Sequence, residues 1–314
     1  MKILNIIVPC FNEENSLVNF YLELENVLKG INNLKWDVLF VDDGSSDNTL
    51  EIIKYLSKNR ENIDFISFSR NFGKESAIYA GLENSSGDYV IIMDADLQDP
   101  PSLIPEMLNN IAQGYDVVAT HRISRKGEPK IRSIFARLFY KIINRISNIE
   151  IVDGARDYRL MKREVVDSIL KLKEYNRFSK GIFQWVGFKN KWIEYENIQR
   201  TEGESSWSFW NLFKYSLEGI VSFSTAPLHI ATITGIIFSI ISFLFIITIV
   251  IRTMIFGDAV GGWPSTVSII LFVGGLQLFS IGILGQYLAK IYLETKNRPI
   301  YIIKEKIIKN KKIL

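Results

Sequence analysis

Two long stretches without a charged residue constrain the fold of this chain most strongly. They cover residues 230–251 and 259–289. About 20 apolar residues are enough to cross the hydrocarbon core of a bilayer, and a small soluble domain could not cover two such segments in series. We therefore predict two transmembrane helices within residues 229–290.

The residues after the second stretch are rich in lysine, which predicts a basic tail over residues 291–314 on the cytoplasmic side of the membrane. Two crossings return the chain to the side on which it started, so the N-terminal region is expected to be cytoplasmic as well. No basic segment followed by a long apolar stretch begins the chain, so the sequence shows no signal-peptide pattern.

The first half of the chain alternates two kinds of segment. Short apolar runs rich in Val, Ile, Phe and Tyr occur at 3–8, 36–41, 63–68, 88–93 and 115–119. Segments with helical spacing lie between them, at 14–29, 47–60, 74–84 and 102–113. Continuous apolar runs suit strands covered on both faces, and strand–helix–strand repeats predict an α/β domain with a mostly parallel, Rossmann-like sheet. Asp47 and Ser102 are the expected N-caps of two of the helices.

Two further segments are amphipathic or aromatic. Residues 130–147 are basic and amphipathic, and residues 207–222 are apolar with few charges, so either could lie on a membrane surface or pack as an ordinary helix. The expected organisation is an α/β domain over 1–206, an interface helix over 207–228, the two spans and the tail.

Charge and cysteine content exclude some classes of protein. A net charge of +3 is too weak to indicate a nucleic-acid-binding protein. Cys10 is the single cysteine, so no disulfide can form within the chain, which fits a reducing compartment.

Polar clusters follow four of the predicted strands, at residues 9–14, 42–46, 69–74 and 94–99. Ligands of parallel α/β sheets bind outside the carboxyl ends of the strands, so these four loops are expected to converge on one crevice. Asp94 and Asp96 lie on the last loop, and two carboxylates on one turn can hold a divalent cation. Asp42 could accept a hydrogen bond from a nucleoside, or it could simply belong to a turn. In that turn Gly44 permits the tight backbone conformation, and Asp47 is the expected cap of the next helix.

The order and spacing of four motifs is more specific than any one of them. VPCFNEE at 8–14, VDDGSSDNT at 41–49, SRNFGKESA at 69–77 and DADLQDPP at 94–101 together resemble glycosyltransferase family 2. The segments DYRLMKREV around Arg159 and QRTEGESSWS around Arg200, with the paired spans, are similar to its polyprenyl-phosphate branch, which includes bactoprenol glucosyltransferases and dolichyl-phosphate mannose synthases.

The resemblance implies a GT-A fold and a role for several residues. The donor-binding residues would be Pro9, Phe11, Glu13, Asp42, Asp94, Asp96 and Gln98. Of these, Asp94, Asp96 and Gln98 would hold Mg²⁺ or Mn²⁺. The candidates for contacts with the acceptor phosphate are Arg122, Arg132 and Arg200. Asp157 would join Asp94 and Asp96 as a catalytic residue beside the acceptor, with Arg159 bracing its loop, although it could instead form a structural salt bridge with Arg156 or Arg159.

The chain departs from the family pattern at three places. Cys10-Phe11 replace a small residue or tyrosine, and Ser206 stands where many members have a lysine. The loop at 153–159 reads DGARDYR, whereas related mannose synthases have a loop resembling DPTSGFR, so the sequence favours the glucosyltransferase side.

The predicted reaction is the inverting transfer of one sugar, glucose from UDP-glucose, to undecaprenyl phosphate. Transfer of mannose from GDP-mannose, or of a sugar from another UDP-sugar, to a polyprenyl or dolichyl phosphate is the alternative. A processive synthase is disfavoured because a Gln-x-x-Arg-Trp signature is absent and two spans cannot build a channel. A scaffold that binds nucleotide-sugar without catalysis is disfavoured by the Asp94/Asp96 pair. Expected partners are the nucleotide-sugar, the lipid, the membrane, a second copy of the chain, a separate flippase and a downstream transferase, but no nucleic acid.

Overall fold

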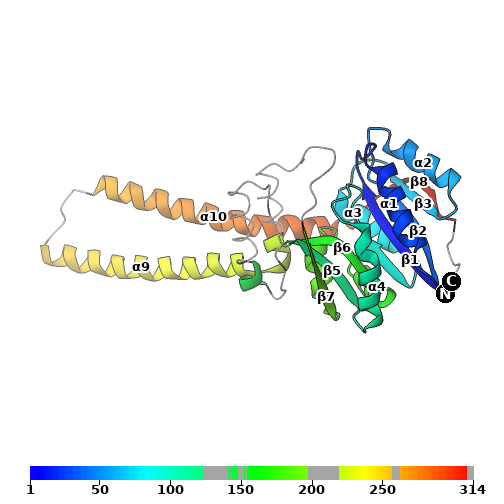
Figure 1. Cartoon of the computed structure of the whole chain (residues 1–314). Coiled ribbons are helices and arrows are strands. Elements are labelled where there is room, and N and C mark those ends of the chain that lie inside the picture. The colour runs from blue at the N-terminus through cyan, green and yellow to red at the C-terminus, as the bar shows by residue number, and fades with distance from the viewer. Residues whose placement is uncertain are drawn as a thin grey trace.

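The computed structural model describes residues 1–122, 141, 143–147, 152, 154–196, 219–256 and 262–309. Most of the two amphipathic segments lies outside these residues, as do the predicted acceptor-phosphate residues Arg132 and Arg200. The described part of the chain forms an α/β domain with a pair of long helices that project from it (Figure 1).

The domain is built on one eight-stranded sheet among the described residues. Its strands are β1 (Lys2–Cys10), β2 (Leu34–Asp42), β3 (Ile63–Phe68), β4 (Tyr89–Ile92), β5 (Val117–Arg122), β6 (Ala155–Lys162), β7 (Asn190–Tyr195) and β8 (Ile303–Ile307). Their spatial order is β7-β5-β6-β4-β1-β2-β3-β8. β1 is parallel to β2 and β4, β2 to β3, and β5 to β7, whereas β6 and β8 pair antiparallel with their neighbours. The predicted mostly parallel sheet is confirmed.

Helices cover both faces of this sheet. They are α1 (Leu17–Lys29), α2 (Thr49–Asn59), α3 (Lys74–Asn84), the short 3-10 helix η1 (Pro101–Leu103), α4 (Ile104–Ala112), α6 (Arg163–Leu170) and α7 (Ser179–Trp185). One core cluster takes its helical residues from α1, α2 and α4, and the other from α3, α6 and α7. Neighbouring strand residues alternate between them: Ile6 belongs to the first cluster and Ile7 to the second, as the two-residue period of a strand requires.

The two predicted N-caps differ from what is observed. The N-cap position of α2 is Asn48, although one oxygen of Asp47 still accepts a hydrogen bond from the Thr49 N–H at 3.0 Å. The Ser102 prediction is wrong, because Pro101 starts η1 and Ser102 lies inside that turn, so that α4 follows Leu103 with no side-chain cap.

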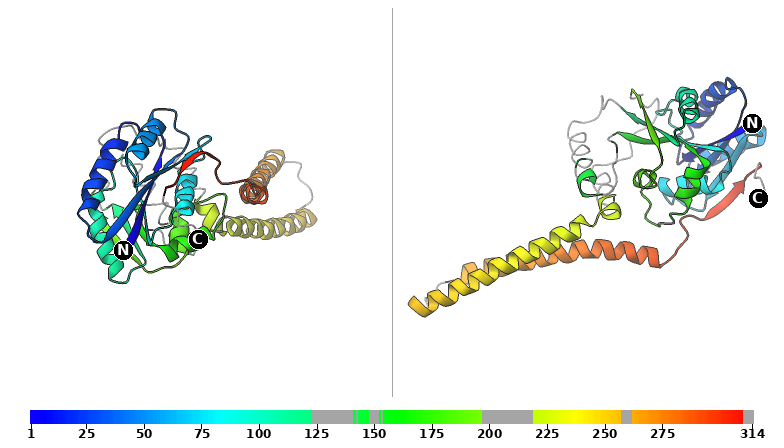
Figure 2. Two further views of the ribbon diagram at one scale, coloured as in Figure 1. Left: turned by 90° about the vertical axis from the view of Figure 1, so that its right-hand side faces the viewer. Right: turned by 90° about the horizontal axis from the view of Figure 1, so that it is seen from below.

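The two long apolar helices are α9 (Ala226–Phe256) and α10 (Trp263–Thr295), and they run side by side away from the domain (Figure 2). Phe238 and Phe272 pack between them, with ring centroids 5.3 Å apart. Large apolar side chains elsewhere on both helices are exposed, such as Phe243 and Leu278. Residues 226–256 and 272–295 are long and apolar enough to cross a membrane, as the sequence predicted.

The region predicted as a basic tail contains the edge strand β8. The residues just before β8 contact the end of β3. The Tyr301 ring packs against Phe68, with centroids 5.0 Å apart, and the Ser69 N–H donates to the Ile302 carbonyl at 3.0 Å. The chain therefore returns from α10 to the sheet, where β8 pairs antiparallel with β3.

Candidate active site

Hydrogen bonds join the loops that follow β1, β2 and β3. The Asn12 N–H donates to Ser45 Oγ at 3.0 Å, and the Asn12 side-chain oxygen accepts from the Ser46 N–H at 2.9 Å. The carboxylate of Asp43 accepts from the N–H groups of Phe72 and Gly73, at 2.6 and 2.9 Å. Three of the four loops that were expected to converge therefore meet here.

The second of these loops packs against the third without room for a side chain. Gly44 has φ +67°, and a Cβ at this position would lie 2.5 Å from the carbonyl carbon of Arg70. Glycine is therefore required at Gly44 by both the backbone conformation and the close approach.

A lysine links the third loop to the fourth and to β6. Lys74, the first residue of α3, places its Nζ 2.7 and 2.9 Å from the two oxygens of Asp94 and 2.8 Å from Asp157 Oδ2. Among the described residues, Asp157 therefore forms its ion pair with Lys74, and not with either of the arginines considered from the sequence. Arg159 instead donates to the backbone carbonyls of Arg156 and Asp157, at 2.8 and 3.3 Å, which agrees with a bracing role.

A second polar cluster lies under the Asp94–Asp96 turn. Asp99 is fully buried, and its Oδ1 accepts hydrogen bonds from Arg156 Nε at 3.1 Å and from the Tyr195 hydroxyl at 2.8 Å. Gln98 Oε1 accepts from Arg122 at 2.7 Å and from Arg156 at 3.4 Å. Two guanidinium groups therefore lie beside the turn, and Arg156 also approaches Asp94 at 3.7 Å.

The predicted nucleoside-binding residues lie on the β1 and β2 loops. Phe11 is exposed, and Pro9 is half-buried at the end of β1. The Glu13 carboxylate accepts from Ser16 Oγ at 2.7 Å. Asp42 is buried, with one oxygen bonded to the Ser45 N–H and the other to Ser67 Oγ. These contacts give Asp42 a structural explanation, and the donor-binding roles of this group stay predictions.

The pKa values of the carboxyl groups around Lys74 are shifted in opposite directions. Burial would raise the pKa of Asp157, but the ammonium of Lys74 and the charge of Lys180 hold it well below its ordinary value. Partial loss of hydration would lower the pKa of Lys74, yet Asp157 and Asp94 raise it. Glu75 differs because burial and the charge of Asp157 raise its pKa to about 7. Asp157 is therefore ionised at neutral pH, whereas Glu75 gains or loses its proton close to neutral pH.

The carboxylate oxygens on the Asp94–Asp96 turn suit a divalent cation that is also bound by a substrate phosphate. Asp94 and Asp96 supply carboxylates from one turn, in which Leu97 adopts φ +56° and Asp96 Oδ1 accepts from the Gln98 N–H. No group of three or more His, Cys, Asp or Glu residues able to hold a metal occurs in the described part of the chain. Mg²⁺ is commonly held by one or two carboxylates plus substrate phosphates, so the two aspartates fit. Gln98 would have to exchange its arginine partners to act as a ligand, and its role stays a prediction.

Comparison with known proteins now places the chain. The sequence profile described as "Glycosyl transferase family 2" matches residues 5–170, which include all four converging loops. The chain belongs to glycosyl transferase family 2. A Bacillus subtilis protein named as a glycosyltransferase, CsbB, is 43% identical over 98% of this chain and 93% of its own length. The bactoprenol glucosyl transferase derived from prophage SfII in Shigella flexneri is 43% identical over 97% of this chain and 98% of its own, and the one from Shigella phage SfX is 42% identical over 98% and 100%.

Several residues of this family 2 site have no role assigned from the sequence. Lys74 lies in SRNFGKESA and Asp99 in DADLQDPP, but neither residue was given a role when these motifs were identified. Tyr195 comes from β7, a strand that the sequence did not predict. The signal available in the sequence was the presence of a lysine and a third acidic residue inside otherwise matched motifs.

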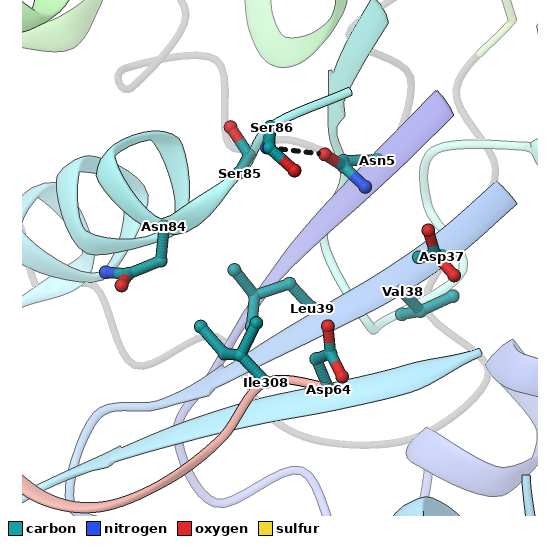
Figure 3. Close-up of a pocket in the computed structure, with 9 residues that line it drawn as sticks. All are labelled: Asn5, Asp37, Val38, Leu39, Asp64, Asn84, Ser85, Ser86 and Ile308. Carbon is teal, nitrogen blue, oxygen red and sulfur yellow. Dashed lines mark hydrogen bonds between the residues drawn. The ribbon is translucent and has the colours of Figure 1, made fainter. Parts of the chain in front are cut away.

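A small pocket in the structure lies away from this site (Figure 3). It is lined by residues near the amino ends of β1, β2 and β3, including Asn5, Asp37 and Asp64, and by residues 84–86 at the C-terminal end of α3. The Asn5 side-chain oxygen accepts there from the Ser86 N–H at 2.9 Å. Because α/β sheets bind ligands at the opposite edge, we assign the active site to the converging loops.

Proposed function

We propose that this family 2 enzyme transfers glucose from UDP-glucose to undecaprenyl (bactoprenol) phosphate at a membrane surface, with inversion at the anomeric carbon. The observation that carries the proposal is the similarity to the bactoprenol glucosyl transferases across nearly the whole chain, which includes both the Asp94–Asp96 turn and the apolar helices. An enzyme with these two features is suited to a water-soluble donor and a lipid acceptor.

Asp94 and Asp96 would hold Mg²⁺ or Mn²⁺, with Gln98 as a further candidate ligand. The cation would neutralise the diphosphate that leaves with the nucleotide. The exposed ring of Phe11 is placed to contact the nucleoside, while Pro9, Glu13 and Asp42 shape its loop.

The acceptor phosphate is anionic near neutral pH and needs little help from a base. Its approach to the sugar is opposed by repulsion between its negative charge and that of the donor diphosphate. Arg122 and Arg156 lie beside the turn, and guanidinium groups bind phosphate through paired hydrogen bonds. Positioning and charge neutralisation would then supply most of the rate, and a single displacement converts an α-linked donor into a β-linked product. Asp157, ionised beside Lys74, would orient the acceptor.

The membrane arrangement follows from the apolar helices. We propose that α9 and α10 cross the bilayer, with the catalytic domain and the C-terminal strand on the cytoplasmic side. The lipid-linked sugar would then need a flippase and a downstream transferase to be used, and association with a second copy of the chain remains part of the proposal.

The test is a transfer assay on the full chain in detergent with undecaprenyl phosphate, Mn²⁺ and one radiolabelled donor at a time: UDP-glucose, UDP-galactose, UDP-GlcNAc or GDP-mannose. Lipid-soluble label is expected with UDP-glucose. Asp96→Asn and Asp157→Ala should abolish transfer, with donor binding retained by Asp157→Ala, whereas Glu51→Gln on the exposed face of α2 should leave it unchanged. Label transferred only from GDP-mannose, formation of polymer, or normal turnover by Asp157→Ala would each contradict the assignment that it tests.

A further inference from the structure

Lys74 connects the two halves of the proposed site. Its ammonium contacts both oxygens of Asp94, a candidate metal ligand, and one oxygen of Asp157, the residue assigned to the acceptor side. We propose that Lys74 is a positioning residue that occupies the cation position on Asp94 before the donor binds, and that the divalent cation displaces it toward Asp157 and the acceptor phosphate. This inference rests on the proposed function and adds a residue to it.

The contact distances make the lysine and a metal ion competitors. At 2.7 and 2.9 Å, the ammonium takes both carboxylate oxygens of Asp94 at hydrogen-bonding distance. A divalent cation needs the lone pairs of these same oxygens. In addition, a cation bound to Asp94 would lie within a few Å of Nζ and repel it. Charge repulsion therefore makes simultaneous binding of the ammonium and the metal ion to Asp94 unfavourable.

The backbone around Lys74 is fixed, so displacement has to occur by rotation of the side chain. Gly73, which precedes it, donates its N–H to the buried carboxylate of Asp43 at 2.9 Å. Glu75, which follows it, accepts hydrogen bonds from the N–H and the hydroxyl of Ser179 on α7. The ammonium already lies 2.8 Å from Asp157 Oδ2, so it can keep this partner when it leaves Asp94.

The displaced ammonium would face the place where the acceptor arrives. The Lys74 side chain is 44% exposed, whereas that of Asp157 is 16% exposed. An ammonium has three N–H donors, so one can remain on Asp157 while another meets an anionic oxygen. Binding of the metal-bound donor would in this way prepare a cation for the second, negatively charged substrate.

The test uses Mn²⁺ alone with the full-length chain in detergent micelles, and free Mn²⁺ is measured by electron paramagnetic resonance. Lys74→Met should bind Mn²⁺ on the order of tenfold more tightly than the wild type, because a competing unit charge a few Å from a divalent ion is removed. Asp157→Asn should weaken Mn²⁺ binding, since Lys74 then pairs with Asp94 alone. In the Lys74→Met background, the Asp157→Asn change should have little further effect.

Lys180→Met is the matched control, because Lys180 acts on Asp157 by its charge and no ion pair to Asp94 is observed for it among the described residues. Its Mn²⁺ affinity should change less than about twofold. Despite its tighter Mn²⁺ binding, Lys74→Met should transfer glucose at least tenfold more slowly, with a raised KM for the lipid acceptor.

The outcomes separate this inference from the proposed function. Unchanged or weaker Mn²⁺ binding by a folded Lys74→Met variant, or equal tightening by Lys180→Met, would overturn the inference even if the wild type transfers glucose. Conversely, the predicted shifts in Mn²⁺ affinity without any lipid-linked product would support the exchange at Asp94 and refute the proposed reaction. A thermal melt establishes that each variant is folded.

Discussion

Replacement of Asp99 by alanine should destabilise the catalytic domain far more than removal of its tyrosine partner. Asp99 is fully buried and accepts from both Arg156 and Tyr195. Loss of one partner of a buried ion pair costs about 3–5 kcal/mol, because a charge is left buried without compensation. Arg156 is 22% exposed and keeps Asp94 as a neighbour at 3.7 Å, so we expect the lower end, about 3 kcal/mol.

Tyr195→Phe removes one hydrogen bond and leaves the ion pair, for a cost of about 1 kcal/mol. For a domain of this size, each kcal/mol lowers the melting temperature by about 2–4 °C. Asp99→Ala should therefore melt about 6–12 °C below the wild type, and Tyr195→Phe about 2–4 °C below it. The assay is tryptophan fluorescence during heating of the full chain in one fixed detergent. Equal shifts for the two variants, or a shift below about 2 °C for Asp99→Ala, would refute the structural role assigned to this pair.

Three further changes test other parts of the account. Gly44→Ala should lower the free energy of unfolding by about 1–3 kcal/mol, because φ is positive and the new Cβ meets Arg70. Gly30→Ala should be tolerated, because φ is negative there and the new Cβ would lie 3.4 Å from the Val27 carbonyl oxygen. Equal melting temperatures for the two variants would contradict this. Glu75 has a folded-state pKa of about 7, above its ordinary 4.5, so the folded state binds more protons and the free energy of unfolding should fall as pH rises from 4.5 to 7. Glu75→Gln should flatten this dependence in melts across that range, and an unchanged slope would argue against it. Tyr301→Ala removes the stacking on Phe68 and should speed tryptic cleavage within β8, followed by mass spectrometry; cleavage at the wild-type rate would count against the packing of this strand.

The buried central strands could be predicted from the sequence because their pattern has a simple cause. The five predicted apolar runs correspond to β1–β5, where helices cover both faces and almost every inward position is apolar. β6 was missed because it carries Arg156, Asp157 and Arg159, and such charges resemble a loop until their buried partners are known. β8 was missed because its IKEKI sequence resembles a solvated tail, and only pairing with β3 makes it a strand.

The candidate site was predicted to the level of its loops, but not to the level of its contacts. The strand ends identified Asp94 and Asp96, since parallel strands bring their carboxyl ends to one edge. The partner of Asp157 could not be found this way, because Lys74 is 83 residues away in the chain and a lysine at the start of a helix is commonly solvated. Only the packing of α3 against the sheet brings the two together.

The most direct test of the account is the position of Mn²⁺ in a complex of the full chain with UDP. Anomalous diffraction at the manganese edge would locate the ion without ambiguity. The account predicts one peak bound by Asp94, Asp96 or both, bridged to the UDP phosphates, with the Lys74 ammonium moved off Asp94 and onto Asp157. A UDP-bound Mn²⁺ held elsewhere, for example in the pocket near Asp37 and Asp64, or an undisturbed Lys74–Asp94 pair beside a bound ion, would contradict it.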